Sequence, residues 1–266
     1  MMSIRVAIAG ARGKMGAEAV HTVMKHDKME LVAVLDYKEV GRTLADLDMF
    51  PASYTVPVFT EMHDLVEATS PDVLVDLTNP HAVYNHTKES LNLNVRPVIG
   101  TTGFTDAQLE ELSTIAKEKE LGCIIAPNFA IGAILMMKFA KEAAKYLPDV
   151  EIIEMHHDQK LDAPSGTAVK TAQLIQEVRT QKTQGHPEEK ETIEGARGGD
   201  FDGMRIHSVR LPGLVAHQQV LFGGDGQLLT IRHDSLNRNS FMSGIAFCVE
   251  EVMKMDQLVY GLENII

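Results

Sequence analysis

Short apolar runs alternate with helical segments through the first half of the chain, and a glycine-rich turn lies at the first junction. The run 4–10 is β-rich, and a helical segment follows from 17 to 25. Further strands are expected at 30–35, 71–78, 96–100 and 123–126, with helices at 81–92 and 105–120, the latter capped by Thr105. This alternation predicts an α/β fold with a Rossmann-like, doubly wound parallel sheet.

The glycine turn is the first candidate binding element. It reads Gly10-Ala11-Arg12-Gly13-Lys14-Met15-Gly16, a G-x-x-G-x-x-G spacing rather than the usual G-x-G-x-x-G. Between a strand and a helix, such a turn admits a dinucleotide pyrophosphate to the backbone and to the helix N-terminus. Glycine-rich turns also serve simply to link a strand to a helix, so the spacing alone is a weak signal.

The end of the second strand strengthens this interpretation. Asp36 follows the strand 30–35, twenty residues after Gly16, where a carboxylate can accept the ribose hydroxyls of NADH. Lys38 and Arg12 are cations that can meet the 2′-phosphate of NADPH. We therefore expect NADPH or NADH as cofactor. The alternative interpretation of Asp36 is a solvated residue at a strand end with no role in binding.

Two further loops follow strands of the same sheet. They are Gly100-Thr101-Thr102-Gly103 and Ala126-Pro127-Asn128-Phe129. Ligands of doubly wound sheets bind beyond the carboxyl ends of the strands. These loops are therefore expected to hold the nicotinamide and its ribose, although ordinary turn chemistry explains them equally well without the glycine turn.

The second half of the chain has a different pattern. A helix is expected at 131–146, with a methionine-rich stripe that is typical of core packing. Strands are expected at 150–157, 205–211, 217–222 and 227–233, the last two joined as a hairpin. An exposed, mobile loop is expected at 180–203 and a long helix at 238–255. We predict a dinucleotide-binding domain at 1–130, with 238–266 packing back on it, and an α+β substrate and oligomerisation domain with a mixed or antiparallel sheet at 131–237.

The stretch 154–168 gathers groups suited to acid–base chemistry. His156 and His157 end a strand, Lys160 follows, and Pro164 enforces a loop before a helix capped by Ser165 or Thr167. A histidine pair, a lysine and a helix N-terminus together favour a small polyanion. Three alternatives remain: structural histidines, a zinc site without a complete ligand set, and Ser165 as a nucleophile without its usual G-x-S-x-G turn.

Charge and composition limit the classes of molecule that the chain can bind and the compartment in which it works. The formal net charge is −12, which argues against nucleic acid and requires local positive charge at any anion site. No apolar run reaches the roughly 18 residues of a membrane span, and the N-terminus is expected to be a first strand rather than a signal peptide. Cys123 and Cys248 lack metal-ligand spacing, so we expect free thiols in the reducing cytoplasm.

The run from Glu154 to Ala168 resembles the signature of the 4-hydroxy-tetrahydrodipicolinate reductase (dihydrodipicolinate reductase) family of the diaminopimelate and lysine pathway. The resemblance also covers the glycine turn, the 100–103 and 126–129 loops and Ile206-His207-Ser208-Val209-Arg210. It spans nearly the whole chain, and the HHDQKLDAPSGTA run is its most specific part. The family's acid-then-arginine pattern after the second strand is replaced here by Asp36-Tyr37-Lys38.

The resemblance implies a role for each matching residue. His156 would be the proton donor and Lys160 the second catalytic residue, while His157, Gly166 and Thr167 would bind the substrate's two carboxylates. The cofactor positions would be Gly10, Ala11, Arg12, Gly13, Lys14, Met15, Asp36, Gly100, Thr101, Thr102, Ala126, Pro127, Asn128 and Phe129. Lys38 is added as the candidate contact to the 2′-phosphate, and no metal is expected. The family reduces a cyclic dicarboxylate with NADPH or NADH and is usually a homotetramer.

Two other functions remain open at this level. One is a different nicotinamide enzyme with a similar first domain, such as an aspartate- or homoserine-type dehydrogenase. The other is a non-catalytic dinucleotide sensor. The HHDQKLDAPSGTA run and the intact donor and carboxylate-binding residues favour neither. We expect the remaining histidines His81, His86, His207, His217 and His233 to be structural or supporting.

Overall fold

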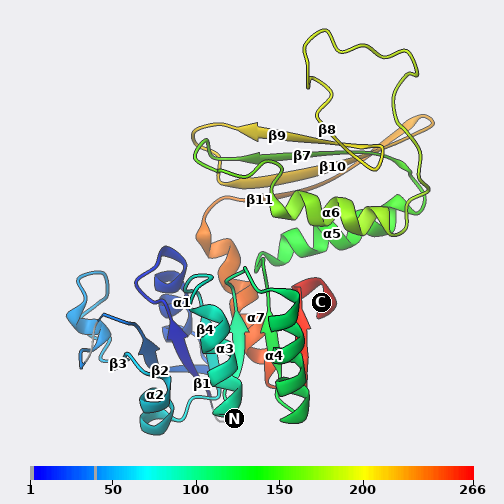
Figure 1. Ribbon diagram of the computed structural model, residues 1–266. Coiled ribbons are helices and arrows are strands. Elements are labelled where there is room, and N and C mark those ends of the chain that lie inside the picture. Colours follow the sequence, from blue (N-terminus) through cyan, green and yellow to red (C-terminus); the bar gives the residue numbers. More distant parts are fainter. Residues whose placement is uncertain (1–2, 39–40) are drawn as a thin grey trace. The chain divides into compact units, whose positions relative to one another are not determined.

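The structure of the chain is a computed structural model that describes residues 3–38 and 41–266. It divides into two compact units (Figure 1). The first comprises Met1–Phe129 and Phe241–Ile266, and the second comprises Ala130–Ser240. None of the helices in the described ranges has the length and apolar character needed to cross a membrane.

The first unit is built on a seven-stranded sheet in which every strand pair is parallel. Its strands, in the order β12-β6-β5-β4-β1-β2-β3, are Leu258–Tyr260, Cys123–Ile125, Arg96–Ile99, Val73–Asp76, Ile4–Ala9, Met29–Leu35 and Val58–Phe59. β1 lies between β2 and β4, so the chain winds outward in both directions from it. The predicted fold class is confirmed, and the buried apolar runs of β1 and β4 are typical of strands covered on both faces.

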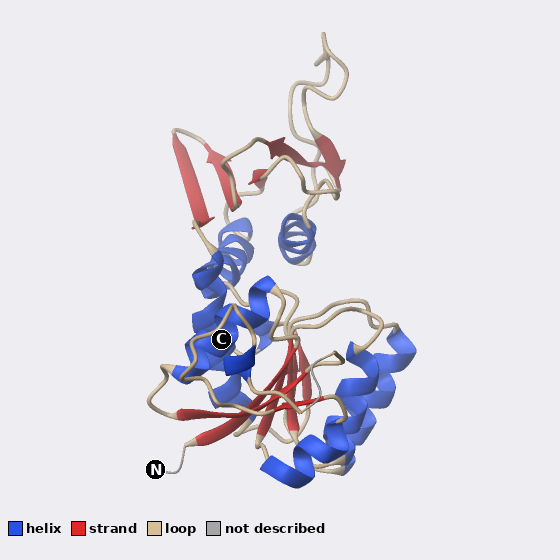
Figure 2. Ribbon diagram, turned by 90° about the vertical axis from the view of Figure 1, so that its left-hand side faces the viewer, coloured by secondary structure: helices blue, strands red, loops and turns tan. Residues whose placement is uncertain are grey.

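Helices lie on both sides of this sheet (Figure 2). The α-helices of the first unit are α1 Lys14–Met24, α2 Met62–Thr69, α3 Val83–Asn92, α4 Asp106–Glu118 and α7 Met242–Val252. Thr105 caps α4 as expected, because its side chain accepts the Gln108 N–H and the Gln108 side chain accepts the Thr105 N–H.

The end of the chain departs from the expected single helix at 238–255. The 3₁₀ helix η2 (Arg238–Phe241) leads into α7, and β12 and the 3₁₀ helix η3 (Leu262–Asn264) follow. The predicted helix at 238–255 was therefore too long, since only Met242–Val252 is α-helical, and β12 then pairs with β6 at the sheet edge. The 3₁₀ helix η1 (Leu44–Asp46), β3 and α2 were not predicted either.

The second unit is a mixed five-stranded sheet with two helices on one face (Figure 1). Its strands, in the order β11-β10-β7-β9-β8, are Gln227–Ser235, Ala216–Gly224, Asp149–His156, Met204–Arg210 and Gly199–Phe201. β7 and β9 are parallel, and the other neighbours are antiparallel. The helices are α5 Ile131–Ala144 and α6 Gly166–Gln176. Met136 and Met137 are buried as expected, whereas Phe139 of the same helix is exposed.

Alternation along β7 separates the two faces of this sheet. Val150, Ile152 and Glu154 are buried, while the residues between them are half-buried. Since Val150 and Ile152 are opposite the buried Phe222 and Val220 of β10, they form the core beneath the helices. Glu154 therefore occupies a core-facing position, which is unusual for a carboxylate.

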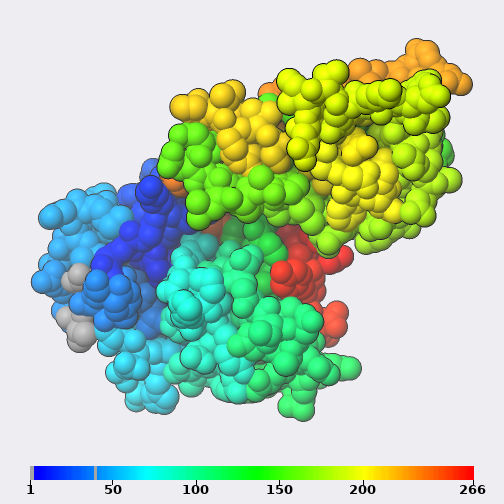
Figure 3. All heavy atoms as spheres, turned by 45° about the horizontal axis from the view of Figure 1, so that its top comes forward, coloured from blue at the N-terminus to red at the C-terminus, as the bar shows by residue number. Residues whose placement is uncertain are grey.

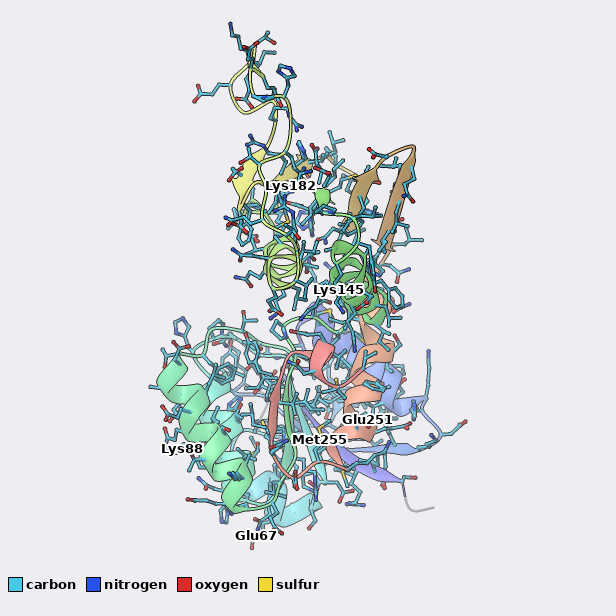
Figure 4. All side chains as sticks on the ribbon, turned by 90° about the vertical axis from the view of Figure 1, so that its right-hand side faces the viewer. Glu67, Lys88, Lys145, Lys182, Glu251 and Met255 are labelled. Carbon is cyan, nitrogen blue, oxygen red and sulfur yellow. The ribbon has the colours of Figure 1, made fainter. Side chains whose placement is uncertain are left out.

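The segment between α6 and β9 lies mostly at the surface of the second unit, yellow-green to yellow in Figure 3. Its base is held by Arg179, which donates to the carbonyls of Pro148, Lys182 and Asp202. Lys182, labelled in Figure 4, also donates to Asp149 at the start of β7. The segment was expected to be one loop at 180–203, but its last residues form β8.

Candidate functional site

The loops that follow four parallel strands meet at one edge of the first unit's sheet. Ala9 of β1 is in register with Leu35 of β2 and with Asp76 of β4. Asp76 is in turn in register with Ile99 of β5, and Ile99 with Ile125 of β6. The glycine turn, Asp36, the 100–103 loop and the 126–129 loop therefore begin at the same edge, where such sheets bind ligands.

The glycine turn leaves its backbone accessible. Gly10 has a φ of +86°, and a Cβ there would lie 2.9 Å from the Leu77 carbonyl oxygen. At Gly16 a Cβ would lie 2.1 Å from the Gly10 carbonyl oxygen, so only glycine lets α1 pack this close. Gly13 is the N-cap of α1 and provides no side-chain acceptor, and the first turn carries no acidic residue. The first N–H groups of α1 are therefore suited to an anion.

Two neighbouring cavities open at this edge. One, of about 540 Å³, is lined by Gly10, Arg12, Gly13, Leu35, Asp36, Tyr37, Thr60, Leu77, Thr78, Asn79, His81, Ala82 and His86. The other, of about 440 Å³, is lined by Met15, Leu77, Thr78, Pro80, Gly100, Thr101, Thr102, Pro127, Asn128, Phe129 and Phe241. Leu77 and Thr78 line both cavities. Of the predicted cofactor residues, Ala11, Lys14, Lys38 and Ala126 line neither cavity.

Arg12 and Asp36 both line the first cavity and are in direct contact. Nε and Nη2 of Arg12 donate to the two oxygens of Asp36, both at 2.7 Å, and this hydrogen bonding raises the pKa of Arg12. The side chains of Arg12 and Lys38 both lie over the exposed ring of Tyr37, at 5.4 Å and 5.2 Å from its centroid. Asp36 also accepts the Lys38 N–H. An anion, two cations and an aromatic ring therefore lie together at the end of β2.

The loop after β4 is a part of the site that sequence reasoning missed. Asp76, fully buried, accepts the N–H and hydroxyl of Thr78 and lies 2.7 Å from Nδ1 of His86. His81 and His86, expected to be structural or supporting, both line the first cavity. The sequence could have indicated this loop, because ligands of doubly wound sheets bind beyond the carboxyl ends of the strands, and residues 77–80 follow such a strand.

The first unit fits a nicotinamide dinucleotide. The uncapped start of α1 accommodates a pyrophosphate, and Gly10 and Gly16 permit its close approach. A carboxylate ends β2 at the position that receives an adenosine ribose. The second cavity, with Thr101, Thr102 and Asn128, offers polar groups beside the ring of Phe129.

The second unit places the predicted proton donor at the end of β7. The His156 side chain is 15% exposed, and its Nδ1 lies 2.6 Å from Oε2 of Glu154. Because β7 and β9 are in register here, His156 also lies opposite Arg210. His157 follows the strand and is exposed.

Glu154 is a fully buried carboxylate with several donors. Nη1 and Nη2 of Arg210 donate to its two oxygens at 2.9 and 2.8 Å, and the Ser165 N–H donates at 3.1 Å. Burial opposes ionisation of Glu154, but hydrogen bonds from His156, Arg210 and Ser208 outweigh burial and lower its pKa to about 2. Glu154 is therefore an ionised acceptor, and Nδ1 of His156 is the donor.

The loop that carries Lys160 is held by short contacts. The Lys160 N–H donates to the His157 carbonyl, and its Nζ lies 2.6 Å from Oδ1 of Asp162. This hydrogen bond lowers the pKa of Asp162. Nη2 of Arg210 donates to the Asp162 carbonyl at 2.7 Å, which ties the loop to β9.

The helix after this loop presents its N-terminus. Ser165 is the N-cap, and its hydroxyl accepts the Ala168 N–H at 3.2 Å. Of the two expected caps, Ser165 and Thr167, the structure uses Ser165, so α6 begins at Gly166. Gly166 is exposed, with open space where a Cβ would be. The amides of the first turn are thus placed to receive a carboxylate.

The predicted residues fall into two groups. The cofactor positions all lie in the first unit, and the catalytic and substrate positions His156, His157, Lys160, Gly166 and Thr167 all lie in the second. His207 and His217 contact Glu151 and Asp234, at 2.9 and 2.7 Å. Across residues 3–38 and 41–266, no three His, Cys, Asp or Glu side chains gather as a set of metal ligands.

Comparison with known families covers almost the whole chain. The family described as "Dihydrodipicolinate reductase, N-terminus" matches residues 4–129, and "Dihydrodipicolinate reductase, C-terminus" matches residues 132–266. A 4-hydroxy-tetrahydrodipicolinate reductase of Lysinibacillus sphaericus is 98% identical over 265 residues, covering 100% of both chains. One from Halalkalibacterium halodurans is 63% identical over 99% of each.

Solved structures support the same family and fold. The dipicolinate-bound dihydrodipicolinate reductase from Paenisporosarcina sp. TG-14 is 66% identical, with a TM-score of 0.92 and full coverage of both chains. A dehydrogenase from Clostridium difficile shares the fold, with a TM-score of 0.65 at 14% identity, over 98% of this chain and 95% of the other. That second likeness supports the dehydrogenase-like architecture alone.

Proposed function

Since this chain belongs to the family of 4-hydroxy-tetrahydrodipicolinate (dihydrodipicolinate) reductases, oxidoreductases of lysine biosynthesis that use NADH or NADPH, we propose which of its residues perform the reduction. The substrate is a cyclic dicarboxylate with a conjugated imine. His156 donates the proton, and Lys160 is the second catalytic residue. His157, Gly166 and Thr167 bind the carboxylates.

The arrangement at the end of β7 carries this proposal. His156 ends the strand, the Lys160 loop follows, and the first turn of α6 begins after its cap Ser165. Bound NADH or NADPH supplies the hydride. The reduced ring then needs a proton at carbon, and the imidazole of His156 provides it as a general acid. Such a donor contributes roughly 10²- to 10⁴-fold in rate.

The carboxylates of the substrate need concentrated positive charge, because the chain has a net charge of −12. Lys160 provides an ammonium group, and the first turn of α6 provides backbone amides and the positive end of the helix dipole. The open space at Gly166 lets a carboxylate approach those amides. His157, exposed at the residue after β7, adds a further donor. Whether the hydroxylated or the dehydrated ring binds, these groups meet the same two carboxylates.

In the first unit we assign the pyrophosphate to the turn from Gly10 to Met15. The adenosine ribose belongs at Asp36, with Arg12 and Lys38 available to a 2′-phosphate. The loops at 100–102 and 126–129 take the nicotinamide half. We propose that residues 1–130 with 238–266 form the cofactor domain and that residues 131–237 form the substrate domain.

We propose a homotetramer assembled through the sheet of the second unit. Helices α5 and α6 pack on one face, and within the described residues no helix covers the other (Figure 1). That other face carries Ile153, Met155 and Leu221, and the hairpin adds Leu228, which is 69% exposed. Glu151 lies on the same face, so apolar and charged groups alternate there, and an uncovered face of this kind is suited to an interface between copies of a chain. The expected readout is the molar mass by light scattering.

The two cysteines support a cytoplasmic location. Cys123 and Cys248 are free and buried, and burial raises the pKa of both thiols, so neither is reactive. A chain that keeps its cysteines unpaired suits a reducing compartment.

The activity is tested by NAD(P)H oxidation with substrate generated freshly from pyruvate and aspartate semialdehyde by the preceding synthase. Oxidation that depends on both the synthase product and this chain supports the proposal. Oxidation of NAD(P)H with aspartate semialdehyde alone would point instead to a homoserine-type dehydrogenase. Cofactor binding without turnover of any substrate would indicate a sensor.

A further inference from the structure

A single buried carboxylate joins the parts of the proposed substrate site. Glu154 has no exposed surface and lies on the helix-facing side of β7. Burying an ionised carboxylate is costly unless donors surround it. Here the donors come from the strand end, from β9 and from the start of α6, so one side chain joins the proposed proton donor to two neighbouring elements.

Glu154 is contacted by the side chains of His156 and Arg210 and by the backbone N–H group of Ser165. Its Oε2 receives Nδ1 of His156 at 2.6 Å, the shortest of the set. The guanidinium of Arg210 spans both oxygens at 2.9 and 2.8 Å, and this bidentate geometry is the strongest way to neutralise a carboxylate. Oε1 also accepts the backbone N–H of Ser165, the residue that caps α6.

Arg210 extends the same network into the catalytic loop. Besides Glu154, its Nη2 donates to the carbonyl of Asp162 at 2.7 Å. Asp162 is the residue that pairs with Nζ of Lys160. The charged groups around the donor are therefore Glu154 and Arg210 in direct contact with each other, with Lys160 and Asp162 in the loop.

We infer that Glu154 is the positioning residue of the proton donor, holding Nδ1 of His156 so that Nε2 delivers the proton, while Arg210 balances the carboxylate's charge. This inference rests on the proposed donor role of His156. A carboxylate on one ring nitrogen fixes the tautomer and the orientation of an imidazole. Alone, the carboxylate would also favour the protonated ring and oppose proton delivery. Arg210 offsets this effect, because it shares both carboxylate oxygens.

The two partners should therefore have opposite effects on the pH profile of kcat. Glu154→Gln removes the negative charge beside the ring, so we expect kcat to fall about 10- to 100-fold, as for other outer partners of functional histidines, with the alkaline limb moved to lower pH. Arg210→Gln leaves Glu154 unbalanced, so kcat should also fall, but with the alkaline limb moved to higher pH. Affinity for NADPH, bound in the first unit, should remain within twofold in both variants.

Glu151 provides a matched control on the same strand. It contacts His207 at 2.9 Å and Arg197 at 2.7 Å, which repeats the carboxylate–histidine–arginine arrangement. It lies three residues before Glu154 and so on the opposite side of β7. Glu151→Gln should leave the alkaline limb at its wild-type position.

The experiment compares kcat from low to high pH for the wild type, E154Q, R210Q, E151Q and H156Q. If E154Q does not fold, the R210Q variant alone tests the positioning role of Glu154, because the alkaline limb of its kcat profile must move to higher pH. A limb that stays in place, or moves the same way in E154Q and R210Q, overturns the positioning role, even if kcat falls. If H156Q keeps wild-type kcat, the donor assignment itself is wrong; a large loss in H156Q with unmoved limbs in E154Q and R210Q refutes the further inference alone.

Discussion

Arg12 forms two hydrogen bonds of 2.7 Å with the carboxylate of Asp36, so the anion expected to favour NADH and a cation expected to favour NADPH neutralise each other. Asp36 is nearly buried, whereas Tyr37 beside it is 75% exposed. The pair itself has no net charge, and Lys38 adds one cation beside it. The pair offers the carboxylate to ribose hydroxyls and the guanidinium to a 2′-phosphate, which fits a family that uses both cofactors.

Lys38 should then contribute the preference for NADPH. Its Nζ lies 5.2 Å from the centroid of Tyr37, on the same side chain that Arg12 contacts. Lys38→Ala removes a cation that only a 2′-phosphate requires, so we expect KM for NADPH to rise about 5- to 10-fold, or roughly 1–1.4 kcal/mol. KM for NADH should change less than twofold. Lys254→Ala, at an exposed lysine that pairs with Glu251, is the control. Equal losses for both cofactors would refute the phosphate contact.

Gly16 should tolerate no side chain. A Cβ would lie 2.1 Å from the Gly10 carbonyl oxygen, so Gly16→Ala must push α1 away from the glycine turn. We expect a loss of about 1–3 kcal/mol in unfolding free energy and a marked rise in the Kd of both cofactors. At Gly223 the nearest atom to a Cβ lies at 3.7 Å, so Gly223→Ala should leave both quantities nearly unchanged. Thermal unfolding and cofactor titration give the two values; a stable G16A with wild-type Kd would contradict the close packing.

Thr167→Val should mainly affect the substrate. Thr167 lies in the first turn of α6, and the valine keeps the shape but loses the hydroxyl. If the substrate's carboxylate binds there, its KM should rise about 5- to 50-fold, with kcat changed less, because a charge-assisted hydrogen bond is lost. Thr114→Val, a similar change on the exposed side of α4, is the control. Unchanged KM together with weaker cofactor binding would place the ligand site elsewhere.

Glu154 should make stability sensitive to acid. Its pKa is about 2 in the folded chain and 4.5 ordinarily, so its ionised form stabilises the fold above pH 4.5. That contribution, about 3 kcal/mol, is lost as the pH falls from 4.5 to about 2. Denaturant unfolding near neutral pH and near pH 3 should show a smaller pH dependence for Glu154→Gln than for the wild type. Glu67→Gln, at an exposed residue of α2 labelled in Figure 4, should behave like the wild type. An identical pH dependence of the unfolding free energy in the wild type, E154Q and E67Q would contradict the ionised state of Glu154.

The fold could be predicted to the extent that each element carries its own pattern. The strands β1 and β4 are apolar runs of the expected length, and the capping box at Thr105 marks the start of α4 directly. By contrast, β3 has two residues and β12 has three, too few for any periodicity. Their place in the sheet depends on neighbours far away in the chain.

The site shows the same division. His156, Lys160 and Ser165 lie within ten residues, so their association is visible in the sequence. Arg210 is 56 residues from Glu154, and no local pattern indicates that the two side chains meet. Glu154 itself left a trace, since it is the polar residue at a position of β7 where alternation requires an apolar one. The 77–80 loop was missed because its strand was expected to continue to Thr78.

The proton-donor role of His156 is tested most directly by the pre-steady-state and steady-state reduction rates of His156→Gln, measured with saturating NADPH and freshly generated substrate. The glutamine approximates the reach of the imidazole but cannot donate a proton as an acid. We predict that kcat falls about 10²- to 10⁴-fold while the Kd of NADPH stays within twofold of the wild type. A variant whose kcat remains within twofold of the wild type would contradict the account.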